Sequence, residues 1–145
     1  QVNAANIGTH NIRKYHDVNC LIINQSELHH ELRQRDGDIK EMAITLKNMI
    51  NAKYIAVTQG KNGAFLINDN KTPERCPGFA AQVIDKIGSG DALLALLSVL
   101  LYSNFDEKLS LLLGSLAAAQ SVETVGNSVP VSKIKLLKTI SHLLK

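Results

Sequence analysis

The chain has 145 residues, 45% of them apolar and 20% charged, which is an ordinary composition for one soluble globular domain with a buried core. A formal net charge of +3 is too small to indicate a nucleic-acid-binding protein, and no apolar stretch is long enough to cross a bilayer. Two cysteines far apart in the sequence exclude a disulfide framework and a zinc-binding spacing, so we expect a cytoplasmic protein without a membrane or nucleic-acid partner.

The first part of the chain predicts two strands and two helices, followed by a hairpin. Residues 18–24 (VNCLIIN) form a nearly continuous apolar run, which is typical of a buried parallel strand. A helix of about ten residues follows, with Leu28 and Leu32 on one face, and a second amphipathic helix begins after an Asp-Gly-Asp turn. Tyr54–Thr58 is the second strand, and a glycine-containing turn joins it to residues 64–68 in a predicted β-hairpin.

The second part predicts one short strand and three helices. Residues 71–79 hold two of the three prolines, so they form at most an edge strand or a loop. Residues 83–84 are predicted to be a brief strand, which a glycine turn joins to a helix from about Asp91. Further helices are predicted for Glu107–Val122 and for residues 132–144. The last helix is amphipathic, with four residues expected to face inward: Ile134, Leu137, Ile140 and Leu144.

Strands that alternate with helices predict an α/β layered domain. Residues 1–3 resemble the tail of a core strand, so we expect the natural protein to continue upstream of this fragment. Small residues in the helix at Glu107–Val122 indicate that either another helix or the flat face of a base packs closely there. These residues are Gly114, Ala117 and Ala118.

The stretch from residue 82 to residue 101 is the centre of the functional prediction. Gly88, Ser89 and Gly90 can take backbone conformations closed to larger residues and let a ligand approach the main chain. The first turn of the following helix has unpaired N–H groups and a partial positive charge, which suit a phosphate. Asp91 would repel that phosphate unless it takes a proton from the attacking hydroxyl. An ordinary helix with an acidic first turn stays open as the alternative.

Three turns follow the predicted strands, at residues 24–27, 58–63 and 85–91. If the strands are parallel, these turns gather at one edge of the sheet, where open α/β sheets bind ligands. They would supply a carboxylate with an amide, a hydroxyl with glycines, and an anion-binding helix end. Phosphoryl transfer with a metal nucleotide needs that set. Asn24 and Glu27 could equally cap a helix, and a threonine at a strand end is common.

The order of these motifs resembles the second half of the ribokinase-like (pfkB family) carbohydrate kinases. The matching motifs are N-x-x-E from Asn24, V-T-x-G-x-x-G from residue 57, and D-x-x-G-x-G-D from Asp85 to Asp91. Runs at residues 3–8, 58–63 and 124–127 are most similar to the kinase domain of bacterial heptose-type sugar kinase/nucleotidyltransferase proteins. The resemblance covers nearly the whole chain. It implies a three-layer α/β/α fold with a mostly parallel sheet, of which residues 1–145 form the C-terminal portion as a single domain.

The resemblance also implies ATP-dependent phosphorylation of a sugar or sugar-phosphate hydroxyl. Asp91 would be the general base, and the N–H groups of Gly88, Ser89 and Gly90 would form the anion hole. Magnesium would be held by Glu27 with Asn24, through water. The implied nucleotide-binding residues are Thr58, Gly60, Gly63, Ser115, Ala118 and Asn127, the last three beside the adenine.

A second ion site is implied at Asp85. In relatives, this aspartate and its neighbours can form a monovalent cation site, so Asp85 is a candidate metal ligand. Lys86 replaces the usual threonine and could put its ammonium group where that ion would bind. The residues therefore leave open whether potassium activates the protein.

Family members are about twice this length, and most of their sugar-binding residues precede the matching segment. We therefore expect this fragment alone to be inactive or nearly so. The implied partners are ATP, a sugar or sugar phosphate and the N-terminal half of the kinase domain. A fused nucleotidyltransferase domain and further copies of the chain are the other partners that the resemblance suggests. Two other classes stay open: a nucleotide-binding or regulatory module without catalysis, and a structural half-domain that pairs with a partner chain.

Overall fold

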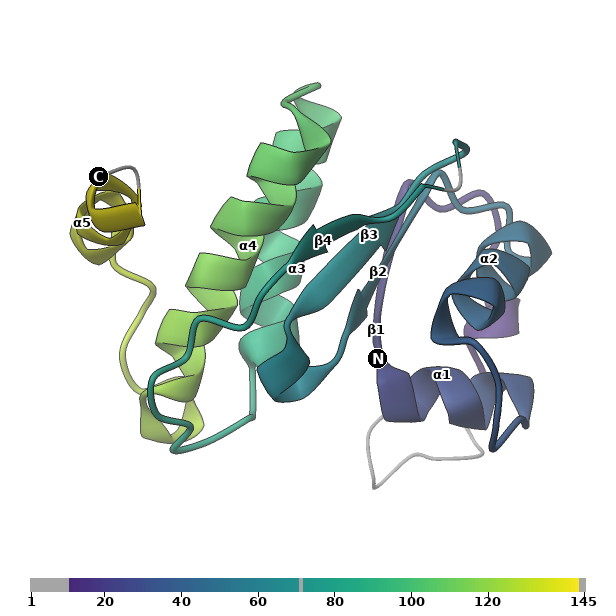
Figure 1. Cartoon of the computed structure of the whole chain (residues 1–145), viewed down its shortest axis with the longest axis horizontal. Coiled ribbons are helices and arrows are strands. Elements are labelled where there is room, and N and C mark those ends of the chain that lie inside the picture. The colour runs from purple at the N-terminus through teal and green to yellow at the C-terminus, as the bar shows by residue number, and fades with distance from the viewer. Residues whose placement is uncertain (1–10, 71, 144–145) are drawn as a thin grey trace. The chain divides into compact units, whose positions relative to one another are not determined.

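The computed structural model describes residues 11–70 and 72–143, without the side chain of Asn127 (Figure 1). The chain divides into two units between Arg75 and Cys76, and each unit is described by itself. The elements are η1 (Ile12–Lys14), β1 (Cys20–Asn24), α1 (Gln25–Leu32), α2 (Ile39–Met49), β2 (Tyr54–Thr58), η2 (Gly60–Asn62), β3 (Ala64–Ile67), β4 (Glu74–Cys76), α3 (Ser89–Tyr102), α4 (Glu107–Val122), η3 (Val125–Asn127) and α5 (Lys133–Leu143).

The sheet has the strand order β1-β2-β3-β4. β1 and β2 pair in parallel, with Asn24 opposite Thr58, whereas β2 and β3 form the predicted antiparallel hairpin. The three middle residues of β2 are buried, as expected for a strand with a partner on each side. β4 is three residues long and lies at the edge of the sheet beside β3, where the proline-containing segment was predicted to be at most an edge strand.

Helices α1 and α2 lie on one face of this sheet (Figure 1). Asp38 caps the start of α2, because its carboxylate accepts the backbone N–H groups of Lys40 and Glu41. Its apolar stripe then faces the strands, because the residues at helical spacing are those that are buried. The resulting core consists of Ile23, Leu28, Met42, Ala43, Leu46, Ile50, Ala52, Ile55, Val57, Phe65 and Ile67.

The second unit is built on the pair α3 and α4, which a short turn joins in antiparallel fashion. α3 is apolar along almost its whole length, and its Leu93 and Leu97 are buried. Gly114 of α4 lies directly against them, because a Cβ atom placed there would be 2.8 Å from Leu93 Cδ1 and 3.2 Å from Leu97 Cβ. We expected either a helix or a base to pack against Gly114, and in the structure the helix α3 packs there.

The predicted strand at residues 83–84 is wrong. Val83 and Ile84 lie in an irregular segment and are 52% and 53% exposed. The N–H group of Ile84 donates to the carbonyl oxygen of Val122 at 2.8 Å instead of to a neighbouring strand. Two β-branched residues favour extended backbone, but a strand also needs a partner that receives its hydrogen bonds. The loop therefore attaches to the end of α4.

The inward face predicted for the last helix is also wrong for two of its residues. α5 has the expected helical bounds within one or two residues, but Ile134 and Leu137 are 67% and 54% exposed. Ile140 is half-buried, and Leu144 lies outside the described residues, as does the strand tail predicted at residues 1–3. An amphipathic pattern indicates which face is apolar but not whether another element covers it. Among the described helices, none is long and apolar enough to cross a membrane.

The two free thiols are both protonated in the folded chain at neutral pH. Burial raises the pKa of Cys20 to about 12. Burial also raises the pKa of Cys76, although the nearby Ser115 hydroxyl partly opposes the effect. At pH 8 we expect iodoacetamide to alkylate Cys20 about 10–100-fold more slowly in the folded chain than in urea, because the thiolate is the nucleophile. Mass spectrometry of timed samples measures both rates, and equal rates would contradict the prediction.

Candidate functional site

Two of the predicted turns meet at the carboxyl edge of β1 and β2. Asn24 ends β1 directly opposite Thr58, which ends β2. The following residues are also joined, because Gln59 Nε2 donates a hydrogen bond of 3.0 Å to Gln25 Oε1. Both amides are partly buried. The sequence motifs did not single out this glutamine pair, since neither residue belongs to a fixed motif position and only the parallel register brings them together.

Asn24 and Glu27 form a capping box at the start of α1. Asn24 Oδ1 accepts the N–H of Glu27 at 2.8 Å, and Glu27 Oε2 accepts the N–H of Asn24 at 3.0 Å. The helix cap that was the alternative prediction for this pair is therefore confirmed. A capping box by itself accounts for the three-residue spacing of Asn24 and Glu27. The same bonds hold the Glu27 carboxylate in place beside the strand edge. Its role toward magnesium stays a prediction.

The turn between β2 and β3 depends on two glycines with positive φ angles. Gly60 has φ 58°, and Gly63 has φ 85° with ψ −141°, a combination that side chains strongly disfavour. The N–H of Gln59 closes the turn by donating to Gly63 O at 2.7 Å. A Cβ atom at Gly60 would meet no other atom within 4 Å, so packing within the chain does not require glycine there. The backbone at Gly60 is thus open to a ligand beside Thr58.

The third turn leads into α3. Gly88 is the N-cap residue with φ 82°, and Ser89, Gly90 and Asp91 are the first three helical residues. The helix therefore begins two residues earlier than predicted. No side chain caps this end, and the first helical hydrogen bond runs from Ala92 N to Gly88 O at 2.9 Å. The preceding N–H groups point out of the helix end, as an anion-binding site requires. Asp91 is exposed in this first turn.

Asp85 has a structural role that the sequence did not indicate. Its Oδ1 atom accepts the N–H of Ile87 at 3.0 Å, and its Oδ2 atom accepts the N–H of Gly126 at 2.9 Å. The hydrogen bond from Ile87 has the larger effect and the one from Gly126 the next, and together they hold the pKa of Asp85 below its ordinary value of 3.8. The interaction therefore stabilises the fold above that pH and is lost as the pH falls through the lowered folded value. The predicted metal role of Asp85 stays a prediction.

The residues predicted beside the adenine lie on α4 and η3. Ser115 and Ala118 are three residues apart on α4, so they share a face of the helix. The Ser115 hydroxyl is buried near the Cys76 thiol and makes no hydrogen bond within the described residues. Asn127 ends η3, but its side chain lies outside what the structure describes. Across residues 11–70 and 72–143, no three or more histidine, cysteine or acidic side chains gather as a metal-binding group.

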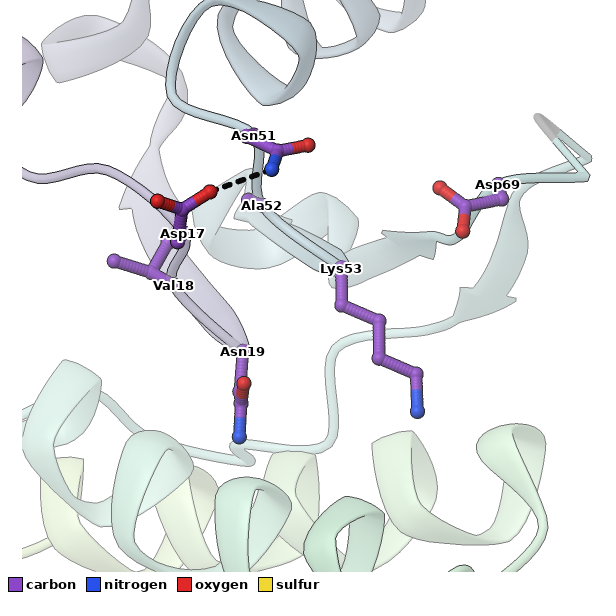
Figure 2. Close-up of a pocket in the computed structure, with 7 residues that line it drawn as sticks. All are labelled: Asp17, Val18, Asn19, Asn51, Ala52, Lys53 and Asp69. Carbon is purple, nitrogen blue, oxygen red and sulfur yellow. Dashed lines mark hydrogen bonds between the residues drawn. The ribbon is translucent and has the colours of Figure 1, made fainter.

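An open hollow of about 260 Å³ lies at the opposite end of β1 and β2 (Figure 2). In it, Asn51 Nδ2 donates a hydrogen bond of 2.6 Å to Asp17 Oδ1. Lys53 and Asp69 also contribute to its lining. None of the predicted site residues borders this hollow. It is therefore separate from the edge where Asn24 meets Thr58.

Comparison with known proteins identifies the fold. A family described as "pfkB family carbohydrate kinase" matches residues 9–134. The bifunctional protein HldE of Magnetococcus marinus is 28% identical over 118 residues, which are 79% of this chain and 24% of that protein. HldE of Campylobacter curvus is 36% identical over 91 residues, or 63% and 19% of the two chains. The chain thus spans about a quarter of the length of these curated relatives, or less.

Solved structures place the chain in the ribokinase-like α/β class, as predicted from the sequence. A ribokinase from Thermotoga maritima superposes with a TM-score of 0.73 and 20% identity, over 85% of this chain and 42% of that chain. Arabidopsis thaliana ribokinase, solved with ribose and ATP, gives a TM-score of 0.70 and 26% identity, over 83% and 41% of the two chains. Because the family match covers most of its length, this chain belongs to the pfkB family of carbohydrate kinases.

Proposed function

We propose that this chain is the nucleotide-binding and catalytic-base portion of an ATP-dependent carbohydrate kinase. Its acceptor is the hydroxyl group of a sugar or sugar phosphate, and the acceptor pocket lies mostly outside these residues. The proposal rests above all on the start of α3, where uncapped N–H groups and the Asp91 carboxylate share one helical turn. Family membership and the motif order around this turn support it.

In this proposal Asp91 removes the proton from the acceptor hydroxyl. The resulting oxygen attacks the γ-phosphorus of ATP, the bond between that phosphorus and the β-phosphate oxygen breaks, and ADP leaves. The N–H groups of Gly88, Ser89 and Gly90 stabilise the negative charge on the transferred phosphoryl group. Gly90 leaves the approach open, because a Cβ atom placed there would meet no other atom within 4 Å.

The carboxyl edge of β1 and β2 is suited to a hydrated magnesium ion and nucleotide phosphates. Glu27 offers a carboxylate and Asn24 an amide oxygen, which are hard oxygen donors of the kind that magnesium takes. Only one carboxylate oxygen of Glu27, Oε2, takes part in the capping bond, so the other is available to bind a magnesium-held water. A bound magnesium ion neutralises phosphate charge. Thr58 and the open backbone at Gly60, with Gly63 completing the turn, lie beside these donors.

The relatives suggest what the whole protein contains. HldE proteins carry the description bifunctional, and the matched residues make up about a quarter of the Magnetococcus marinus protein. We therefore propose that the kinase portion is joined to a second activity, for which the sequence resemblance suggests a nucleotidyltransferase domain.

Calorimetric titration of Mg-ATP into the chain tests the nucleotide site. We expect saturable binding that Glu27→Gln weakens by about tenfold or more and Asp91→Asn changes little. Glutamine is a suitable replacement because it can keep the capping box of α1 while it removes the charge. Glu41→Gln, in the first turn of α2, is the matched control because it removes an equivalent charge outside the strand edge. Absence of binding, or equal weakening by both glutamine variants, would overturn the proposed site.

A further inference from the structure

The segment before α3 is attached to the far end of α4. The N–H groups of Ile84 and Asp85 both donate to the carbonyl oxygen of Val122, at 2.8 and 3.2 Å. Val122 is the last residue of α4, where helical carbonyl groups lack partners within the helix. These bonds bring the segment beside η3, although the two are about forty residues apart in the sequence.

The Asp85 carboxylate completes this attachment through both of its oxygens. One oxygen accepts from Ile87, which immediately precedes the N-cap residue Gly88, and the other accepts from Gly126 in η3. Gly126 has φ 57° and ψ 32°, a left-handed conformation that directs its N–H to the carboxylate at little cost for glycine. We call Asp85 with its two donors, Ile87 and Gly126, the Asp85 clasp.

The Asp85 clasp holds the start of α3 through hydrogen bonds made by residues outside the helix. The helix end has no side-chain cap, so local capping does not orient its N–H groups. The remaining local contact is from Ser89 Oγ, which donates to Lys86 O at 3.0 Å and so tightens the same loop. The position of the residue before Gly88 therefore depends on Asp85, and through Asp85 on η3.

We propose that Asp85 is a positioning residue that aligns the N–H groups at the start of α3 with η3 by direct hydrogen bonds, without an intervening cation. This inference rests on the proposed kinase function. It departs from the metal-ligand role that the sequence resemblance implied for Asp85. Both carboxylate oxygens accept backbone hydrogen bonds, and charged acceptors make such bonds strong. Catalysis depends on this alignment because small displacements of the groups around a reacting phosphate cost up to 10²-fold in rate.

Amide hydrogen exchange measured by NMR tests the clasp independently of activity. In Asp85→Ala we expect exchange at Ile87 and Gly126 to rise by about tenfold or more, with shifted amide resonances at residues 88–91. Asp85→Asn keeps the size of the side chain and should give an intermediate effect, so the test survives if the alanine variant does not fold. Asp106→Asn is the matched control, because Asp106 caps α4 by accepting the N–H of Leu109 at 2.9 Å but joins no distant segment. Unchanged exchange in both Asp85 variants would overturn the clasp.

Two further readouts separate a positioning role from its alternatives. In the kinase with its acceptor site, Asp85→Asn should lower kcat by about 10–100-fold and leave the KM for ATP within about threefold. Adding potassium chloride, compared with tetramethylammonium chloride, should not shift the Ile87 and Gly126 resonances. A potassium-specific shift would mean that Asp85 binds the cation and would overturn the proposal. The wild-type protein could show the Asp85 clasp by NMR and yet show no kinase turnover. That result would overturn the proposed function and the catalytic role of Asp85, but not the clasp itself.

Discussion

Replacing Asp91 by asparagine is expected to lower kcat for phosphorylation of the acceptor by about 10²–10⁴-fold, with the affinity for Mg-ATP nearly unchanged. Asparagine has the size of aspartate but cannot take the proton from the attacking hydroxyl. Asp91 is the third residue of α3 and is exposed, so its side chain supports no buried core. The change should therefore affect the chemical step and not the fold.

The cost of this change to stability can be bounded in advance. An acidic residue in the first turn of a helix interacts with the helix dipole by about 0.3–1 kcal/mol, which Asp91→Asn would remove. Glu41→Gln removes the same kind of charge from the first turn of α2 and controls for this loss. Steady-state kinetics in the protein with its acceptor site measure kcat, and thermal melting measures stability. A variant that keeps a tenth or more of wild-type kcat would show that Asp91 is only a helix-end residue.

Replacing Gly114 by valine is expected to destabilise the chain by about 1–3 kcal/mol and to lower Tm by several degrees. The first added carbon would lie 2.8 Å from Leu93 Cδ1 and 3.2 Å from Leu97 Cβ, and 3.4 Å from a backbone oxygen. The tip of Leu93 can move, but Leu97 Cβ belongs to the helix itself. Valine adds two further methyl groups in the same space, so α3 and α4 must separate or shift.

Two substitutions sharpen this test. Gly114→Ala adds one carbon and also favours the helix by about 1 kcal/mol, so its net effect should be small. Ala95→Val places a valine on an exposed position of α3 and should change stability by no more than about 0.5 kcal/mol. Chemical denaturation of the three variants ranks them. A Gly114→Val variant as stable as Ala95→Val would mean that the seam between α3 and α4 is looser than the structure indicates.

The elements with strong local patterns could be predicted from the sequence almost to the residue. β2 and α4 have the predicted bounds, Tyr54–Thr58 and Glu107–Val122. Each is rich in apolar residues along most of its length, so the local sequence indicates where the element begins and ends. The parallel pairing of β1 with β2 agrees with the nearly continuous apolar run at residues 18–24, which is typical of a buried parallel strand.

The structural features that the sequence did not reveal depend on partners distant in the sequence. Val83 and Ile84 have strand propensity, but their segment bonds to the end of α4. Asp85 matched a motif, but its acceptance of the Gly126 N–H joins residues 41 positions apart and cannot be read from either. For Asn24 and Glu27 the sequence allowed either a helix cap or a metal site. The capping box depends only on residues close in the sequence, so it could be predicted from the sequence. The roles of these residues toward a ligand depend also on the ligand, which the amino-acid sequence does not describe.

The division between Arg75 and Cys76 has a consequence for synthesis on the ribosome. The pairings β1–β2 and β2–β3, and the core beneath them, all come from the first 67 residues. The contacts of α3 with α4 and the bonds of Asp85 and Ile84 come from residues 84–126. Translation delivers these two sets in sequence, so the hairpin and its two covering helices can become a cooperative folding unit before the glycine turn at Gly88 has left the exit tunnel.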